Sequence, residues 1–471
     1  MAVSDHQQSI VLLDIKNRLG HPPDLVIRTW NGKEKVVYLS TLVNEERVVE
    51  EIIRPLLDFS TKSSDSTDFD AVITSSQVEA ARGADEQISS LLKGFVIVLA
   101  SDGSVWRINL KNEKKRSINE PAQEKAVRGP KDGFIEDLAT NMGLVRQRLQ
   151  SQDLRVEEHI IGDAAGTTTV LFYVQPYVKE NILDEVRGRL RSIQLQAIID
   201  ASYIEEWIKD NRWSPFPTME YTERPDKMVS AILQGRVAIM ADGSPTCLLV
   251  PTIFAHFLMA SEDQYVLPYA ATLVRWLRLM AMFIAFALPS LFIALTTIHH
   301  GMIPPFLGVT IAKARIGLPL PIVMEVVMME VLMELVREAG LRMPGPLGQS
   351  VTIVGTLVIG EAAVTAGIVS APVVIVVSLT TLASFAIPGY HMALAIRLLR
   401  FPMMLLASVL GLVGIVWYIM LILIHLGSIR SFGIPYLTPA GPWLRQDIKD
   451  TLFRLPRWKL NGNPSYARRK K

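Results

Sequence analysis

Four glutamates and one arginine stand within a single apolar, methionine-rich stretch at residues 321–340. On a helix, a four-residue spacing puts Glu330, Glu334 and Glu338 on one face, with Glu325 roughly opposite. Arg337 can pair with Glu334 at three-residue spacing. Two interpretations remain open for this helix. It is an amphipathic helix that lies on a membrane surface or re-enters an assembly, or it forms a wet vestibule that attracts cations.

A paired-carboxylate enzyme site is not expected in this helix. The stretch lacks the partner histidine, the nucleophile and the metal pattern that such a site needs. Elsewhere the sequence has neither a GxGxxG fingerprint after a strand nor a GxxxxGK[ST] phosphate loop. We therefore expect no enzymatic activity and no cofactor.

One further carboxylate, Glu361, stands alone in a run of apolar and small residues at 349–369. The run is close to the roughly 20 residues that a helix needs to cross a hydrocarbon core. A carboxylate at membrane depth is costly, and it normally faces a bundle interior or a water-filled path. We expect the residues on the same helix face to line a pore with it, namely Val354, Leu357, Val358, Val364 and Thr365.

The residue types suggest what each position of such a pore would do. Rings of Val354 and Leu357 block ions by dewetting, and a ring of Glu361 favours cations. Small residues such as Gly355 and Ala362 would pack on neighbouring helices. The alternative is that Glu361 is a buried carboxyl group that hydrogen-bonds between helices.

Composition excludes several other classes of function. A net charge of +2 over 471 residues gives no reason to expect nucleic-acid binding. One cysteine excludes an internal disulfide and a cysteine-rich metal site. The histidines also lack the spacing of metal ligands, so no metal is expected.

The apolar residues gather in the second half of the chain, which predicts an all-α membrane domain at 266–430. We expect spanning helices near 279–298, 349–369, 371–388 and 402–427, with the glutamate-rich helix at 321–340 in addition. Residues 391–401 are expected to form a basic connector. The tail at 431–471 is basic, which favours the cytosolic face and contact with anionic lipid. The N-terminus lacks a signal-peptide pattern, so both termini are expected in the cytosol.

The first half predicts two similar α/β subdomains, at 1–116 and 117–265. The pattern that repeats is a helix end, a glycine, a β run and then Asp-Gly-Ser, seen as SSLLKGFVIVLASDGS and SAILQGRVAIMADGS. The fold class is therefore an α+β region of two similar subdomains, followed by a helical membrane domain.

Long motifs in this sequence resemble the A subunit of the GerA-type germinant receptors of endospore-forming bacteria. They include VRGPKDGFIEDLATNMGLVRQR at 127–148, SPFPTMEYTERPDK at 214–227, VREAGLRMPGPLGQSV at 336–351 and VIGEAAVTAGIVS at 358–370. A relative from the SpoVA operon shares the membrane core. One departure is position 361, which is Glu where the family usually has Gln.

The resemblance implies a spore inner-membrane protein that works with a transporter-like B subunit and a lipoprotein C subunit. It also implies that copies of the A subunit assemble as a ring and release ions. Three hypotheses follow: a nutrient-gated ion channel subunit, a non-conducting scaffold that couples a germinant-binding partner to other machinery, and a self-contained secondary transporter. The last is the weakest, because no inverted repeat is visible in the membrane half.

Overall fold

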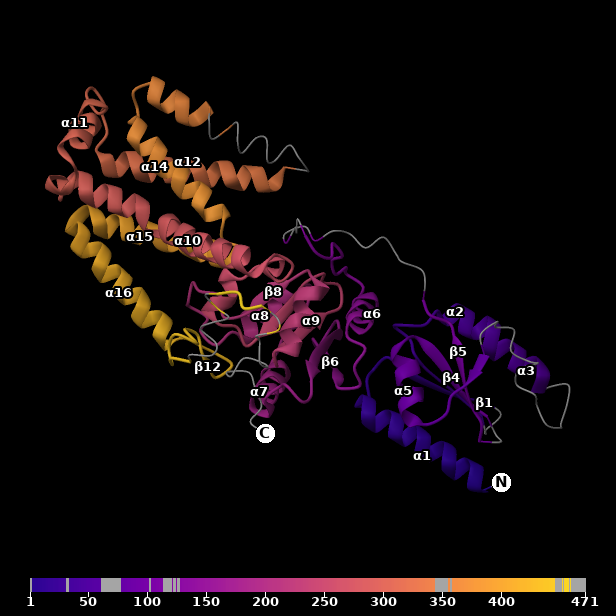
Figure 1. The fold of residues 1–471 in the computed structure, drawn as a ribbon. Helices are drawn as coiled ribbons and strands as arrows, with labels where there is room; N and C mark the ends of the chain where they lie inside the picture. The colour runs from indigo at the N-terminus through magenta and orange to yellow at the C-terminus, as the bar shows by residue number, and fades with distance from the viewer. Residues whose placement is uncertain are drawn as a thin grey trace. The chain divides into compact units, whose positions relative to one another are not determined.

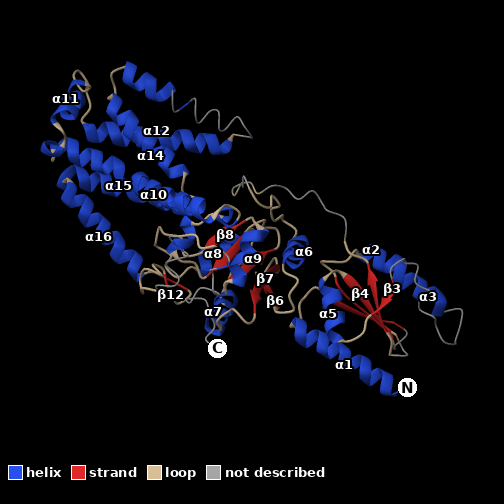
Figure 2. Cartoon of the chain, in the orientation of Figure 1, coloured by secondary structure: helices blue, strands red, loops and turns tan. Residues whose placement is uncertain are grey.

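The computed structural model of the chain describes residues 2–30, 34–60, 78–100, 103–112, 121, 124, 128–343, 355, 358–444, 451, 453–456 and 458. The chain divides into two compact units. The first is Met1–Lys209 with Met219–Thr252, and the second is Asp210–Thr218 with Ile253–Leu460. Among the described residues, the strands belong to the first unit except for one short pair, and the second unit is otherwise helical (Figure 2).

The first unit begins with a five-stranded antiparallel sheet in the order β1-β2-β4-β5-β3. Its strands are β1 (Leu25–Trp30), β2 (Glu34–Leu39), β3 (Val78–Ala80), β4 (Phe95–Leu99) and β5 (Val105–Asn109). Its helices are α1 (Ala2–Leu19), α2 (Glu45–Val48), the π-helix η1 (Val49–Ile53), α3 (Arg54–Ser60) and α5 (Ala84–Leu92).

Helices cover both faces of this sheet (Figure 1). Because successive side chains of a strand point to opposite faces, the apolar run of β2 serves two cores. Val37 and Leu39 pack in the core with α1 and α5, whereas Val36 and Tyr38 pack in the core with α2 and η1. The central strands are therefore apolar throughout instead of alternating.

A second five-stranded sheet follows in the same unit, with the order β6-β7-β9-β10-β8. Its strands are β6 (Leu154–Ile161), β7 (Thr167–Val174), β8 (Glu220–Thr222), β9 (Val237–Ala241) and β10 (Cys247–Val250). Its helices are α6 (Leu138–Arg148), α7 (Glu180–Arg191), α8 (Ala201–Ile208) and α9 (Pro225–Leu233). Helices α6 and α9 pack on one face of the sheet through a core that includes Val145, Met228 and Phe172.

The two sheets have the same strand order when β1 to β5 are matched in sequence with β6 to β10. The predicted repeat is therefore confirmed at the level of topology. The Gly-Ser pairs of the two repeats, Gly103-Ser104 and Gly243-Ser244, also correspond, since each lies in the hairpin between the fourth and fifth strands of its sheet, whereas Asp102 lies outside the described residues. Gly103 (φ 88°) and Gly243 (φ 81°) adopt the left-handed conformation that such turns require.

Six helices of the second unit have both ends within the described residues, and residues 358–365 are also helical. The six are α10 (Pro268–Thr297), α11 (Pro305–Lys313), α12 (Ile322–Arg342), α14 (Ala371–Phe385), α15 (Tyr390–Leu410) and α16 (Leu412–Ser428). The short turns η2 (Phe254–Leu258), η3 (Ser261–Gln264) and η4 (His300–Met302) flank α10, and the strands β11 (Arg430–Ser431) and β12 (Ile434–Pro435) follow α16. Among the described helices, α10 and α15 are long and apolar enough to cross a membrane, and α14 and α16 are shorter apolar helices.

Several helix boundaries differ from the sequence-based expectation. The first span, expected at 279–298, belongs to a longer helix, because α10 begins at Pro268. The expected connector at 391–401 is helical, because α15 runs from Tyr390 through Pro402 to Leu410. The expected span at 402–427 is instead broken at Gly411, whose φ is 61°. A Cβ atom at Gly411 would lie 2.4 Å from the His299 ring, so close packing requires glycine there and the chain turns.

Candidate functional site

Helix α12 holds its first glutamate in a fully buried position. Glu325 is 0% exposed, and its Oε2 accepts a hydrogen bond from the backbone N–H of Ser370 at 2.8 Å. The Arg315 Nε lies 3.4 Å from the other carboxylate oxygen and forms an ion pair without a hydrogen bond. The carboxylate therefore joins α12 to the start of α14.

The next glutamates of α12 pair with arginines of α15. Glu330 and Arg400 form an ion pair in which each side chain is 2% exposed. Glu334 lies 3.4 Å from Arg397 Nη1 and 3.3 Å from Arg337 Nη1. The second unit thus holds a charge cluster formed by these five residues, four of them buried and Glu334 32% exposed.

Arg337 also links the cluster to α14. Its Nη2 donates to the Ser384 hydroxyl at 2.9 Å, and its guanidinium lies 4.8 Å from the centre of the Phe385 ring. These contacts compensate part of the desolvation of a side chain that is only 8% exposed.

Glu330, Glu334 and Glu338, which were expected on one face of the helix, do not share one environment. Glu330 is buried, whereas the Glu338 side chain is 57% exposed and pairs with Arg342 at 2.6 Å. The reason lies on α15, where Arg397 and Arg400 reach α12 from a segment that the sequence placed in a connector. The sequence analysis did not identify Arg397 and Arg400 as partners of these glutamates. Their three-residue spacing, which puts two residues on one face of a helix, is the signal that could have identified them.

Glu361 has a different environment. It is exposed and lies in the helical residues 358–365, and no described residue pairs with its carboxylate. Val358 (55% exposed), Val364 (36% exposed) and Thr365 are exposed with it. Val354 and Leu357, the other expected pore-lining positions, lie outside the described residues.

Other described residues of this segment pack on the second unit. Ala363 is partly buried against its core, and a Cβ added at Gly355 would come within 3.4 Å of Val336. Gly360 is buried, and a Cβ added there would come within 3.2 Å of Val374 Cγ1 on α14. The small residues Ala362 and Ala366 are exposed. The described part of the segment therefore presents its carboxylate and some of its small residues to its surroundings.

No group of three or more His, Cys, Asp or Glu side chains is placed to hold a metal ion in the described part of the chain. The candidate site is thus defined by its charges. It combines an ion-pair cluster of two glutamates and three arginines between α12 and α15 with the carboxylate of Glu361, which no described residue pairs with.

Comparisons with known proteins agree on one family. The sequence profile described as Bacillus/Clostridium GerA spore germination protein matches residues 14–466. Spore germination protein KA of Bacillus subtilis (strain 168) is 38% identical over 463 residues, covering 96% of this chain and 85% of that protein. Spore germination protein A1 of the same organism is 40% identical over 421 residues, covering 89% and 87%.

Two further matches complete the comparison. The uncharacterized membrane protein YfkQ of Bacillus subtilis (strain 168) is 39% identical over 437 residues, covering 92% of this chain and 85% of that protein. The crystal structure of the N-terminal domain of the A subunit of the Bacillus megaterium spore germinant receptor GerK3 matches with a TM-score of 0.40 and 26% identity, covering 52% of this chain and 94% of that one. By the profile match and these identities, the chain belongs to the Bacillus/Clostridium GerA spore germination protein family.

Proposed function

We propose that this protein is the A subunit of a spore germinant receptor and forms an oligomeric channel that releases ions when partner subunits sense a nutrient. Relatives named spore germination proteins KA and A1 support the role in germination. The partners are a transporter-like B subunit and a lipoprotein C subunit. The complex resides in the spore inner membrane, with both termini of this chain in the cytosol.

The observation that carries the channel proposal is the exposure of Glu361 without an ion-pair partner among the described residues. A carboxylate in contact with lipid is strongly unfavourable, so this helix needs water or another chain beside it. A ring of identical helices supplies both, because Glu361 then faces a shared water-filled path. The exposed Ala362 and Ala366 provide surfaces on which neighbouring helices can pack closely.

The environments of the other glutamates also favour Glu361 as the pore-lining carboxylate. Glu325 and Glu330 are neutralised inside the second unit, so α12 does not present an acidic vestibule at these positions. Along the proposed pore, Glu361 attracts cations, and the apolar Val354 and Leu357 close the path when the receptor is at rest.

The test is to reconstitute the full chain in liposomes, alone and with its B and C partners. The oligomeric state is measured by native mass spectrometry, and the release of trapped K⁺ is measured on addition of nutrient. The proposal expects a closed oligomer and nutrient-dependent release in the complete receptor. A stable oligomer that never conducts with its partners would instead establish the chain as a scaffold that couples the sensor to other machinery.

A further inference from the structure

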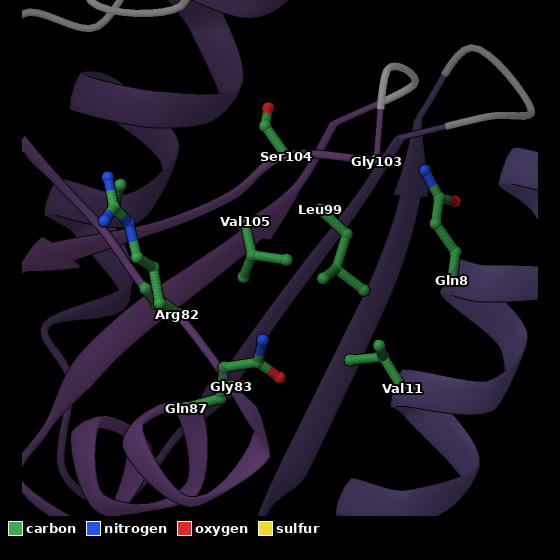
Figure 3. A pocket seen from close by; sticks show the side chains of 11 residues that line it. Gln8, Val11, Arg82, Gly83, Gln87, Leu99, Gly103, Ser104 and Val105 are labelled. Carbon is green, nitrogen blue, oxygen red and sulfur yellow. The ribbon is translucent and has the colours of Figure 1, made fainter.

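A pocket of about 400 Å³ lies beside the first sheet in the first unit, with walls from α1, the start of α5 and the β4–β5 hairpin (Figure 3). Its two buried amides, Gln8 and Gln87, lie on opposite sides of this space, so they do not form one binding site. A more continuous exposed surface lies in the second unit, at the start of α10.

The exposed surface at the start of α10 is apolar throughout. Every exposed residue between positions 266 and 283 is apolar or aromatic. Four of them share one side of the helix, because they are spaced by four and three residues. They are named the α10 stripe here and are 46–73% exposed: Tyr269, Leu273, Trp276 and Met280. A continuous apolar surface of this kind is unfavourable in water, so it indicates contact with a membrane or a partner.

The two arginines in this part of α10 lie on the opposite, buried side of the helix. Arg275 Nε donates to Asp263 Oδ2 at 3.1 Å, and Arg278 Nη1 donates to both oxygens of the same carboxylate at 2.9 Å. Arg275 Nη1 also donates to the backbone carbonyl of Thr451 at 3.2 Å. The arginine side chains are therefore paired inside the second unit and do not interrupt the α10 stripe.

The length of α10 matches the full thickness of a bilayer. At 1.5 Å per residue, its 30 residues extend about 45 Å. The hydrocarbon core of a bilayer is about 30 Å thick, and the headgroup regions bring the total to roughly 40–45 Å. If residues 279–297 cross the hydrocarbon core, the earlier residues of α10 therefore lie at the level of the headgroups.

A segment near the C-terminus adds another aromatic side chain beside the α10 stripe. The backbone N–H of Arg454 donates to the Thr272 hydroxyl at 3.0 Å, which joins this segment to α10. The neighbouring Phe453 is 48% exposed, and its ring centre lies 5.9 Å from that of Trp276. Two segments that are distant in the chain thus contribute aromatic side chains to one surface.

The apolar surface continues along α10 beyond the stripe. Leu279 and Phe283 line a pocket of about 250 Å³, whose other walls come from α10, α15, α16, Phe216 and Phe254. The residues that line this pocket are all apolar. The α10 stripe is therefore continuous with the apolar surface of a helix that is long enough to cross a membrane.

From these observations we propose that the α10 stripe and Phe453 lie at the boundary between the headgroups and the acyl chains of a phospholipid bilayer. Tyrosine and tryptophan favour this boundary, because their rings are apolar and their O–H and N–H groups reach water. Lipid contact then begins about three turns before residue 279, where the expected span starts. This surface goes beyond the proposed function, and its test measures no ion flux, so the two proposals fail independently.

The first experiment measures the surroundings of single nitroxide labels on the full chain in nanodiscs that contain phosphatidylglycerol. The one cysteine of the sequence, Cys247, is 0% exposed, so cysteines introduced at the surface are labelled selectively. Leu273→Cys reports on the stripe, Leu405→Cys is the lipid reference on α15, and Lys93→Cys is the water reference at the end of α5. Spin relaxation by oxygen, which concentrates in lipid, is compared with relaxation by a water-soluble nickel chelate.

We expect the oxygen-to-nickel ratio of Leu273→Cys to lie above that of Lys93→Cys and below that of Leu405→Cys. The reason is that the headgroup boundary lies between water and the hydrocarbon core. A ratio equal to that of Lys93→Cys would overturn the proposal. Protection of the Leu273→Cys label from both reagents would also overturn it, because protein would then cover the stripe.

The second experiment tests the position of Phe453 with a matched pair of threonine variants. A label at Phe453→Cys should give a ratio similar to that of Leu273→Cys. Thr272→Val removes the hydroxyl that holds the C-terminal segment, so it should shift this ratio toward the water reference. Thr310→Val, whose hydroxyl bonds within its own helix, should leave the ratio unchanged. A Phe453→Cys ratio equal to that of Lys93→Cys without either threonine variant would overturn the assignment of Phe453 to this surface.

Discussion

Helix α12 and the helical residues 358–365 both carry carboxylates in the second unit, but the two segments differ in how those carboxylates are buried and paired. Glu325 and Glu330 are buried beside arginines, whereas Glu361 is exposed and unpaired among the described residues. A buried charge must be neutralised where it lies. An exposed carboxylate on an apolar helix instead requires something outside the single chain, which is why we assign the pore to Glu361.

The largest loss of stability is expected when a buried ion pair loses one of its two partners. Arg400→Met leaves the Glu330 carboxylate buried without its arginine and should lower the free energy of unfolding by about 3–5 kcal/mol. Chemical denaturation of the chain in detergent measures this. Arg342→Met breaks the exposed pair with Glu338 and is the control, with an expected loss of about 0–1 kcal/mol.

A double substitution sharpens this first prediction. Combining Glu330→Met with Arg400→Met removes both charges, so it should recover most of the lost stability. If Arg400→Met were no more destabilising than Arg342→Met, the α12–α15 pair would not be buried as described.

A smaller effect is expected at the second buried glutamate. Glu325→Gln keeps an oxygen that accepts from the Ser370 N–H but removes the ion pair with Arg315. We expect a loss of about 1–3 kcal/mol, because the Arg315 side chain is 30% exposed and can reach water. The same denaturation experiment measures it, and a loss as large as that of Arg400→Met would contradict this ranking of the two pairs.

The smallest effect concerns Glu157, a half-buried carboxylate of the second sheet. Burial acts to raise the pKa of Glu157, but polar contacts with His159, Arg187 and Tyr173 outweigh it and hold that pKa well below its ordinary value. A lowered folded-state pKa stabilises the fold above the unfolded pKa of about 4.3, and this contribution is lost as pH falls through the folded pKa.

Tyr173→Phe removes one of these contacts, so the pKa of Glu157 should rise toward its unfolded value. The free energy of unfolding at pH 7, where Glu157 is ionised in both states, should then fall by less than about 1 kcal/mol. Denaturation at pH 7 measures the change, with Tyr177→Phe as a control at an exposed tyrosine. An unchanged free energy of unfolding at pH 7 would mean that Tyr173 does not hold the Glu157 charge.

Local pattern in the sequence was enough to predict the two sheets. The helix-Gly-strand-Asp-Gly-Ser repeat depends on turn chemistry and on strand alternation, which neighbouring residues determine. The shared strand order of the two sheets follows from that repeat.

The helical unit was less predictable because its boundaries depend on contacts distant in sequence. Gly411 ends α15 where it packs against His299, more than 100 residues earlier in the chain. Arg397 and Arg400 looked like a connector because their partners on α12 also lie far back in the chain, 70 residues earlier in the case of Glu330 and Arg400. Glu361 was found because a lone charge in an apolar run is itself a local signal.

The most direct test of the account is the ion selectivity of the reconstituted receptor with Glu361→Gln. Reversal potentials in planar bilayers with a KCl gradient compare this variant with Glu338→Gln, which changes an exposed glutamate that pairs with Arg342. We predict that Glu361→Gln still conducts but loses cation preference, whereas Glu338→Gln behaves as the unaltered protein. Unchanged selectivity in Glu361→Gln, with a normal oligomer, would contradict the assignment of this carboxylate to the pore.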